Sequence, residues 1–325
     1  MSLAVYQDRF ARLVVNVRQG RASPHKICML LAVLDLSRSG ALRENRVLFA
    51  PPLLERYSMF FAAVRGPSDH ANAYFPFFHL SGALRGGQAS FWHLRPLPGR
   101  EQALTALSTA RSVADITDNV SHAEFDPELF DLLRAPAAID VLSEVLARRW
   151  FDRGLQDLRA VVGRSTDVSH YERQLRDGTA LAARELLPPS WVRSPAFRRV
   201  VVQLYDYRCA ATGLRLLLDN GEAMVEAAHI HPFCEAGDDD PRNGLALTPN
   251  MHWAMDKNLI APGPDYVWHV SKAIDTRIAD YQSLLAIEGK EVLRPMDRRM
   301  WPKQEVLAWR LGKLRDHDWI ARIEA

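Results

Sequence analysis

How the C-terminal part of this chain folds is decided by residues 226–256, which read EAAHIHPFCEAGDDDPRNGLALTPNMHWAMD. The segment opens on small apolar residues before His229, which indicates a short strand, and residues 209–213 are expected to complete a hairpin with it. A loop with one glycine and three aspartates follows at 237–242. Thr248 and Pro249 then predict the start of a helix, because threonine caps helix N-termini and proline suits the first helical position. The expected order is strand, strand, loop and short helix.

Three spacings within this segment bring chemically capable residues together. Asn243 follows His229 by 14 residues and precedes His252 by 9, and Asp256 lies 4 residues after His252. Side chains four residues apart share one face of a helix, so His252 and Asp256 can bind one cation. Phosphodiester hydrolysis needs such a cation and also a base that works near pH 7, and His229 on the neighbouring strand can supply that base.

These motifs resemble the HNH, or ββα-metal, endonuclease family, and most of all the branch of modification-dependent bacterial restriction enzymes. The positions that carry the resemblance are His229-Ile230-x-Pro232-Phe233, Asn243-Gly244-Leu245-x-Leu247 and His252-x3-Asp256. The resemblance implies that His229 is the general base and that Asn243 holds the loop or the base in position. It also implies that His252 and Asp256 bind a divalent metal ion, Mg²⁺ or Mn²⁺.

The chain departs from this family at the position directly before the base. Many HNH proteins have an aspartate or histidine there as a further metal ligand, whereas this chain has Ala228. Strand alternation puts Glu226 on the same face as Ala228, so Glu226 is a candidate to reach the metal, directly or through water. The aspartates of the following loop, Asp238, Asp239 and Asp240, are interpreted as solvated.

Length and composition indicate a globular protein of two domains. The chain has 325 residues, of which 48% are hydrophobic and 25% charged, so extensive disorder is not expected. The net charge of +2 means that nucleic-acid binding would need locally basic surface. Charged residues interrupt any signal-peptide core in the first twenty positions, and no apolar stretch is long enough to span a membrane. A cytoplasmic protein without membrane contact is expected.

The expected fold class is α+β. A helix-rich N-terminal DNA-reading domain is placed at 1–162, a linker at 163–195 and a C-terminal ββα-metal (HNH) nuclease domain at 196–325. The linker is placed where prolines interrupt the chain, at Pro188, Pro189 and Pro195.

The N-terminal region carries two short motifs of its own. Pro24-His25-Lys26 lies at an expected helix start, where free N–H groups and the helix dipole attract an anion. Phe75-Pro76-Phe77-Phe78 is unusually aromatic for the start of a loop. Together they resemble the sulfur-binding domain of phosphorothioate-dependent restriction endonucleases, which implies a DNA- and sulfur-binding site made of His25, Lys26, Phe75, Pro76 and His79. That family usually has tyrosine at the position of Phe75 and a small residue at that of His79.

The sequence therefore predicts a metal-dependent endonuclease that cuts double-stranded DNA after recognising a phosphorothioate. Two alternatives stay open. The N-terminal domain could read a modified base, a nucleotide signal or a partner protein, or the chain could be a DNA-binding protein with a decayed nuclease site. Retention of His229, Asn243, His252 and Asp256 argues against decay. Because each chain has one cutting site, cleavage of both strands favours a homodimer or two successive binding events.

Overall fold

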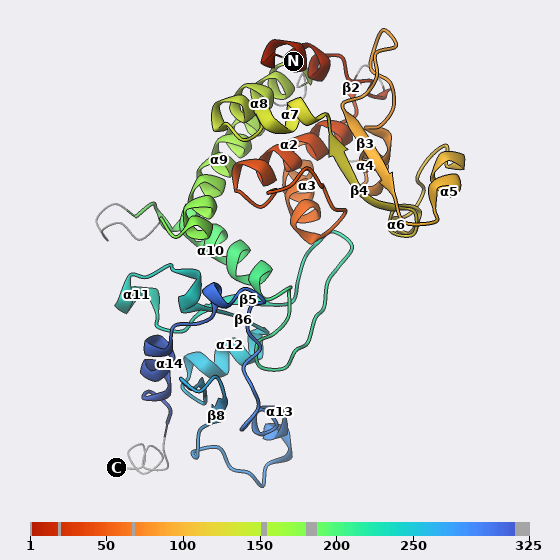
Figure 1. The fold of residues 1–325 in the computed structure, drawn as a ribbon. Helices are drawn as coiled ribbons and strands as arrows, with labels where there is room; N and C mark the ends of the chain where they lie inside the picture. The colour runs from red at the N-terminus through yellow and green to blue at the C-terminus, as the bar shows by residue number, and fades with distance from the viewer. Residues whose placement is uncertain (1, 19–20, 67–68, 151–154, 180–186, 316–325) are drawn as a thin grey trace. The chain divides into compact units, whose positions relative to one another are not determined.

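The computed structural model of the chain consists of two compact units, shown in Figure 1. It describes residues 2–18, 21–66, 69–150, 155–179 and 187–315. The first unit comprises Met1–Arg173 and Leu218–Glu222, and the second comprises Gln174–Leu217 and Ala223–Ala325. Within the described residues, no helix is long and apolar enough to cross a membrane.

The first unit is mostly helical, with two small antiparallel sheets. Its helices are α1 (Leu3–Ala11), α2 (His25–Arg38), α3 (Pro51–Val64), α4 (Tyr74–His79), α5 (Glu101–Ala106), α6 (Val113–Thr117), α7 (Pro127–Leu132), α8 (Pro136–Trp150) and most of α9 (Leu155–Asp177). Its strands pair as β1 (Val17–Arg18) with β2 (Arg21–Ala22) and as β3 (Trp92–Pro96) with β4 (Val120–Phe125).

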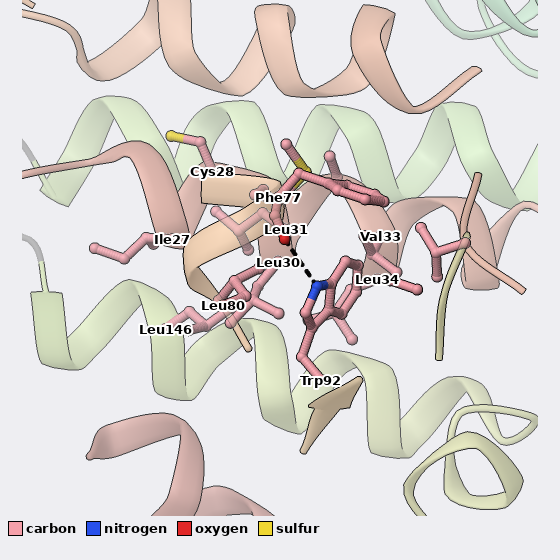
Figure 2. Close-up of a cluster of buried hydrophobic side chains, with 14 of the residues drawn as sticks. Ile27, Cys28, Leu30, Leu31, Val33, Leu34, Phe77, Leu80, Trp92 and Leu146 are labelled. Carbon is pink, nitrogen blue, oxygen red and sulfur yellow. Dashed lines mark hydrogen bonds between the residues drawn. The ribbon is translucent and has the colours of Figure 1, made fainter. Parts of the chain in front are cut away.

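Helix α2 lies at the centre of this unit because it is apolar on nearly all sides. Every residue from 27 to 38 is buried, and α3, α4 and α8 pack around the helix. Figure 2 shows part of this core, including Leu30, Leu34 and Trp92. The Trp92 indole N–H donates to the carbonyl of Phe77 at 2.9 Å, so the one polar atom of this large side chain is satisfied. Each fully buried large apolar side chain contributes about 1.5–3 kcal/mol to stability.

The same core contains a fully buried ion network. The Arg56 guanidinium of α3 donates to Asp35 of α2 at 2.9 Å and to Glu172 of α9 at 2.7 Å, and all three side chains are 0% exposed. The hydroxyls of Ser165 and Ser169 also donate to Asp35, at 2.6 and 2.8 Å. The network therefore joins α9 to the two central helices.

The second unit consists of short elements around two more antiparallel pairs. Its helices are α10 (Ser190–Leu204), α11 (Phe233–Ala236), α12 (Pro249–Asp256), α13 (Gln282–Leu285) and α14 (Gln304–Leu311), with 3-10 turns η2 (Pro241–Asn243), η3 (Ala279–Tyr281) and η4 (Arg298–Met300). Its strands pair as β5 (Glu226–His229) with β6 (Gly244–Leu247) and as β7 (Ile260–Pro262) with β8 (Trp268–Val270). Helices α10 and α12 both pack against β5 and β6.

Three local expectations need correction. The hairpin partner of β5 is β6, which follows it in the chain, and residues 209–213 form a turn instead. The aromatic run at 75–78 belongs to helix α4, because Pro76, Phe77 and Phe78 are buried in the core of the first unit. The segment expected to be a linker, 163–195, contains the end of α9 and the start of α10. The domain boundaries themselves stay predictions.

Candidate active site

His229 is the last residue of β5, where it pairs in register with Gly244. Its ring stacks on Phe197 of α10, with centroids 4.0 Å apart and planes 1° apart. Its Nε2 lies 3.0 Å from Asp239 Oδ1. A carboxylate can only accept, so Nε2 carries the proton and donates it, which leaves the Nδ1 lone pair as the basic site.

Asp239 is the carboxylate that orients this ring. Its other oxygen accepts from Arg193 at 2.7 Å, and its side chain is 3% exposed. Burial acts to raise the pKa of Asp239, but the hydrogen bonds from His229 and Arg193 outweigh burial and hold that pKa below its ordinary value. Asp239 therefore stays ionised, and the expectation of a solvated loop is wrong for this residue.

Asp240 is also buried instead of solvated. It accepts from the Arg242 guanidinium at 2.6 Å and lies 3.0 Å from Lys303 Nζ, which also binds Asp238. Burial acts to raise the pKa of Asp240, but the hydrogen bonds from Arg242 and Lys303 lower it overall. Three basic side chains thus fix the loop that carries Asp239. Sequence reasoning missed this arrangement, because two of these partners, Arg193 and Lys303, lie far from the loop in the chain.

Asn243 is fully buried behind the same loop. Its side-chain oxygen accepts from the backbone N–H of His231 at 2.9 Å, and its Nδ2 donates to the carbonyls of His231 and Asp238, both at 3.0 Å. These bonds join the residues just after β5 to the start of the aspartate loop. Asn243 therefore braces both sides of His229 without touching its ring.

His252 and its carboxylates form the second cluster of the site. On α12, His252 Nε2 lies 3.5 Å from Asp256 Oδ2, as expected for residues one helical turn apart. Glu226 of β5 approaches the opposite nitrogen, Nδ1, at 2.9 Å. Both carboxylates are about half exposed, at 53% and 52%. Glu226 thus reaches His252, but on the side of the ring away from Asp256.

The donors suit a hard divalent cation, but they do not all converge. One ion can bind a single ring nitrogen, so Nε2 with Asp256 and Nδ1 with Glu226 are separate pairs. No group of three His, Cys, Asp or Glu side chains in the described residues is arranged to hold a metal ion. The half-exposed pair on α12 suits Mg²⁺ or Mn²⁺, which keep several water ligands and need few protein donors.

Arg310 of α14 is a structural residue that sequence reasoning missed. Its guanidinium donates to the carbonyl of Ile230 at 2.6 Å and to the side chain of Asn258 at 3.2 Å, and the residue is 3% exposed. It therefore links the end of β5 to the chain just after α12. No local pattern identifies Arg310, since its acceptors lie far earlier in the sequence.

In the first unit, the residues of the expected sulfur site lie at the start of α2 and along α4. His25 Nε2 donates to the carbonyl of His70 at 2.9 Å and Nδ1 accepts from Ser23 at 2.7 Å, so both ring nitrogens have partners. Lys26 is half-buried, and burial lowers its pKa. The Lys26 ammonium is therefore the better candidate to bind an anion, because both ring nitrogens of His25 are engaged by Ser23 and the carbonyl of His70.

On the α4 side of this region, two aromatic rings lie next to each other. The rings of Phe75 and His79 lie 4.3 Å apart, and His79 Nε2 lies 2.9 Å from the Thr109 hydroxyl. Burial lowers the pKa of His79, and the charge of Lys26 lowers it further. Helices α2 and α4, which carry Lys26 and His79, pack against each other. Pro76 is buried. The structure thus brings Lys26, His79 and Phe75 into one neighbourhood.

Comparison with known proteins identifies the C-terminal part. Residues 209–261 match the family described as HNH endonuclease. Among solved structures, one described as the modification dependent TagI restriction endonuclease is 23% identical over 38% of this chain and 39% of that chain, with a TM-score of 0.28. The match thus spans about two fifths of that neighbour's length, and no curated protein matches the chain. The predicted α+β fold, helix-rich with an HNH endonuclease domain toward the C-terminus, is confirmed.

Proposed function

We propose that this protein is a metal-dependent restriction endonuclease that hydrolyses phosphodiester bonds of double-stranded DNA after reading a modification on it. The observation that carries the proposal is the His229–Asp239 pair on β5 of the HNH domain. An ionised, buried carboxylate that accepts from Nε2 fixes the ring and stabilises its protonated form. This is what a base needs in order to take a proton from water.

In this reaction the Nδ1 atom of His229 accepts a proton from the attacking water. Stacking on Phe197 and the bond to Asp239 prevent the ring from turning, so Nδ1 keeps one direction. Asn243 holds the two chain segments that carry His229 and Asp239. The chain therefore orders its base before DNA binds, which lowers the cost of reaching the reactive geometry.

The metal ion is assigned to His252 and Asp256. Glu226 accepts from Nδ1–H of His252, which directs the Nε2 lone pair toward Asp256, and a carboxylate behind a ligating histidine is a common arrangement. Glu226 therefore acts as a positioning residue in this proposal. A bound Mg²⁺ or Mn²⁺ would neutralise charge on the phosphoryl and leaving oxygens.

The first unit is assigned the reading of the modification, a phosphorothioate. Lys26 supplies the charge for a phosphate, and the Phe75 ring supplies apolar surface beside it. A sulfur atom on the phosphate is larger and less tightly hydrated than oxygen, so apolar surface desolvates it at lower cost. His25 and His79 shape the site, with Pro76 beneath it. A homodimer in the cytoplasm, with one cutting site for each strand, completes the proposal.

A plasmid-nicking assay with Mg²⁺ or Mn²⁺ tests the nuclease assignment. We expect His229→Ala to lower the cleavage rate by about 100-fold or more, the usual contribution of a general base. The matched control is His269→Ala, because His269 is also half-buried in the second unit and also faces a carboxylate, Asp265, at 3.6 Å. Normal nicking by His229→Ala in clean preparations would contradict the assignment. Inactive wild-type protein that still binds DNA would favour the decayed site.

A further inference from the structure

The loop between α13 and α14 carries an unusual combination of exposed methionine and arginine. Residues 294–303 read RPMDRRMWPK, with four basic side chains and one acidic side chain. Met296 is fully exposed, at 101%, and is followed closely by Arg298 and Arg299, both exposed. Within the described part of the chain, Arg298 has no carboxylate partner. An apolar tip held in water between cations has no role in the packing of this unit.

The loop is held in one shape by its own contacts. The Trp301 indole N–H donates to the carbonyl of Pro295 at 2.8 Å, and this bond closes the turn. The Asp297 side chain accepts from the backbone N–H of Arg299 at 3.0 Å at the start of η4. The Arg294 guanidinium lies over the Trp301 ring at 4.2 Å. Met296 is therefore displayed on a preformed turn.

The loop is attached directly to the active-site aspartates. Lys303, at its end, lies 3.0 Å from both Asp238 and Asp240, the residues on either side of Asp239. The Lys303 backbone N–H also donates to the carbonyl of Arg242 at 3.1 Å. A ligand that contacts the loop therefore lies beside the segment that orients His229.

We propose that this loop grips duplex DNA next to the cleaved phosphodiester, with Arg298 and Arg299 on backbone phosphates and Met296 as a wedge against the base pairs. The proposal rests on the proposed function, and charge decides the occupant. Arg294, Arg299 and Lys303 have carboxylate partners, but Arg298 has none in the described residues, and the exposed Arg298–Arg299 pair suits a polyanion and opposes a second copy of the same loop. Proteins that bend DNA insert methionine and other apolar side chains between base steps in this way.

Binding of a 25-base-pair duplex by the full-length protein in EDTA tests the arginines without any cleavage. We expect the double variant Arg298→Ala/Arg299→Ala to bind at least about 10-fold more weakly near physiological salt. We also expect the slope of log affinity against log salt to fall by about 2, since each phosphate contact contributes about 0.9 to it.

The chain offers a close control for this measurement. Arg277 is exposed and forms a two-point pair with Asp275, at 3.0 and 2.8 Å, just as Arg299 does with Asp297, at 3.1 and 2.7 Å. Arg277→Ala should leave affinity and salt slope unchanged. Equal behaviour of the double variant and Arg277→Ala overturns the proposal.

A set of duplexes, each with 2-aminopurine at one position, tests the wedge. Wild-type protein should raise the fluorescence at one or two positions, because unstacking relieves quenching, and Met296→Ala should abolish that rise. Met224→Ala, at another exposed methionine of the same unit, should keep it. A rise that survives Met296→Ala overturns the wedge, and so does sedimentation showing that Met296→Ala dissociates a dimer, which would assign the tip to a second copy.

The two proposals fail differently. Normal DNA binding by the arginine variants beside an inactive His229→Ala removes only the loop from the mechanism. Weak binding by the arginine variants beside an active His229→Ala removes only the base.

Discussion

Asp239 accepts a hydrogen bond from the proposed base His229, so its charge is expected to affect catalysis directly. Asp239→Asn keeps an oxygen that can accept from His229 Nε2 but removes the charge that stabilises the protonated ring. We expect the single-turnover rate of DNA cleavage to fall about 10- to 100-fold, the usual cost of losing a partner behind an active group. The affinity for DNA should not change, because Asp239 is almost completely buried. Loss of rate and DNA affinity together would indicate a general structural defect instead.

The lowered pKa of Asp239 also predicts how stability depends on pH. A carboxyl whose folded pKa is depressed stabilises the fold above its ordinary pKa and loses this contribution as pH falls through the folded value. Asp239→Asn should therefore destabilise the second unit by about 1–3 kcal/mol at pH 7, and the difference should begin to narrow as pH falls below about 4. Thermal melting at pH 7 and at several pH values below about 4 measures this difference in stability. The exposed Asp280→Asn variant is the control. A difference that does not narrow at all as pH falls below about 4 would show that charge is not the cause.

At the scale of elements, α12 presents its two metal candidates on one face. His252→Ala or Asp256→Ala should each abolish measurable Mn²⁺ binding in calorimetry. Each change leaves only one protein ligand for the ion in the proposed site. Glu226→Gln should weaken binding by about 10- to 100-fold, since Glu226 orients the ring from behind. His269→Ala removes a histidine that also lies four residues from an aspartate, Asp265, and should leave Mn²⁺ binding intact. Loss of Mn²⁺ binding in that control would assign the metal site to His269 and Asp265 instead.

The buried ion network is one of the contacts that join helix α9 to the first unit. Arg56→Ala leaves Asp35 and Glu172 buried without their cation, which typically costs about 3–5 kcal/mol. Urea unfolding should therefore show a large loss of stability. Arg148→Ala removes an exposed pair with Glu144 on α8 and should change stability by less than about 1 kcal/mol. Similar midpoints for the two variants would mean that the network is not needed for stability.

Elements with strong local signals could be predicted from the sequence. Thr248-Pro249 marks the start of α12, and Pro24 precedes α2 as expected. Elements whose structure depends on contacts with distant parts of the chain could not be predicted in this way. Residues 209–213 lie in a turn because β6, with an apolar run of its own, takes the place beside β5. The aromatic run at 75–78 is helical because Pro76, Phe77 and Phe78 are buried in the core around α2.

The candidate site divides in the same way. The spacing of His252 and Asp256 could be read from helical periodicity, and their proximity is observed. The partner of His229 could not be read in this way, because three consecutive aspartates look alike in the sequence and only the contacts with Arg193 and Lys303 distinguish them. Local sequence shows which residues can react, whereas distant basic residues decide which carboxylate is buried.

At the scale of the whole molecule, the remaining question is what the first unit reads. The full-length His229→Ala protein should bind a duplex with one phosphorothioate more tightly than the same duplex with ordinary phosphate. The reason is the half-buried ammonium of Lys26 near the Phe75–His79 ring pair. The ammonium attracts either anion, but only the apolar ring surface favours sulfur over oxygen.

Two variants should separate these contributions, because they fail in different ways. Lys26→Ala should weaken binding to both duplexes and lower the salt slope by about 1, since it removes one phosphate contact. Phe75→Ala should leave ordinary DNA binding nearly intact and erase the preference for sulfur, since it opens the site to water. His79→Ala tests the position where a small residue is usual in sulfur-binding domains, and a stronger preference for sulfur would show that this ring crowds the site. Equal affinity of the parent protein for both duplexes, with each stereoisomer and several flanking sequences tried, would assign the first unit to a modified base, a nucleotide signal or a partner protein instead.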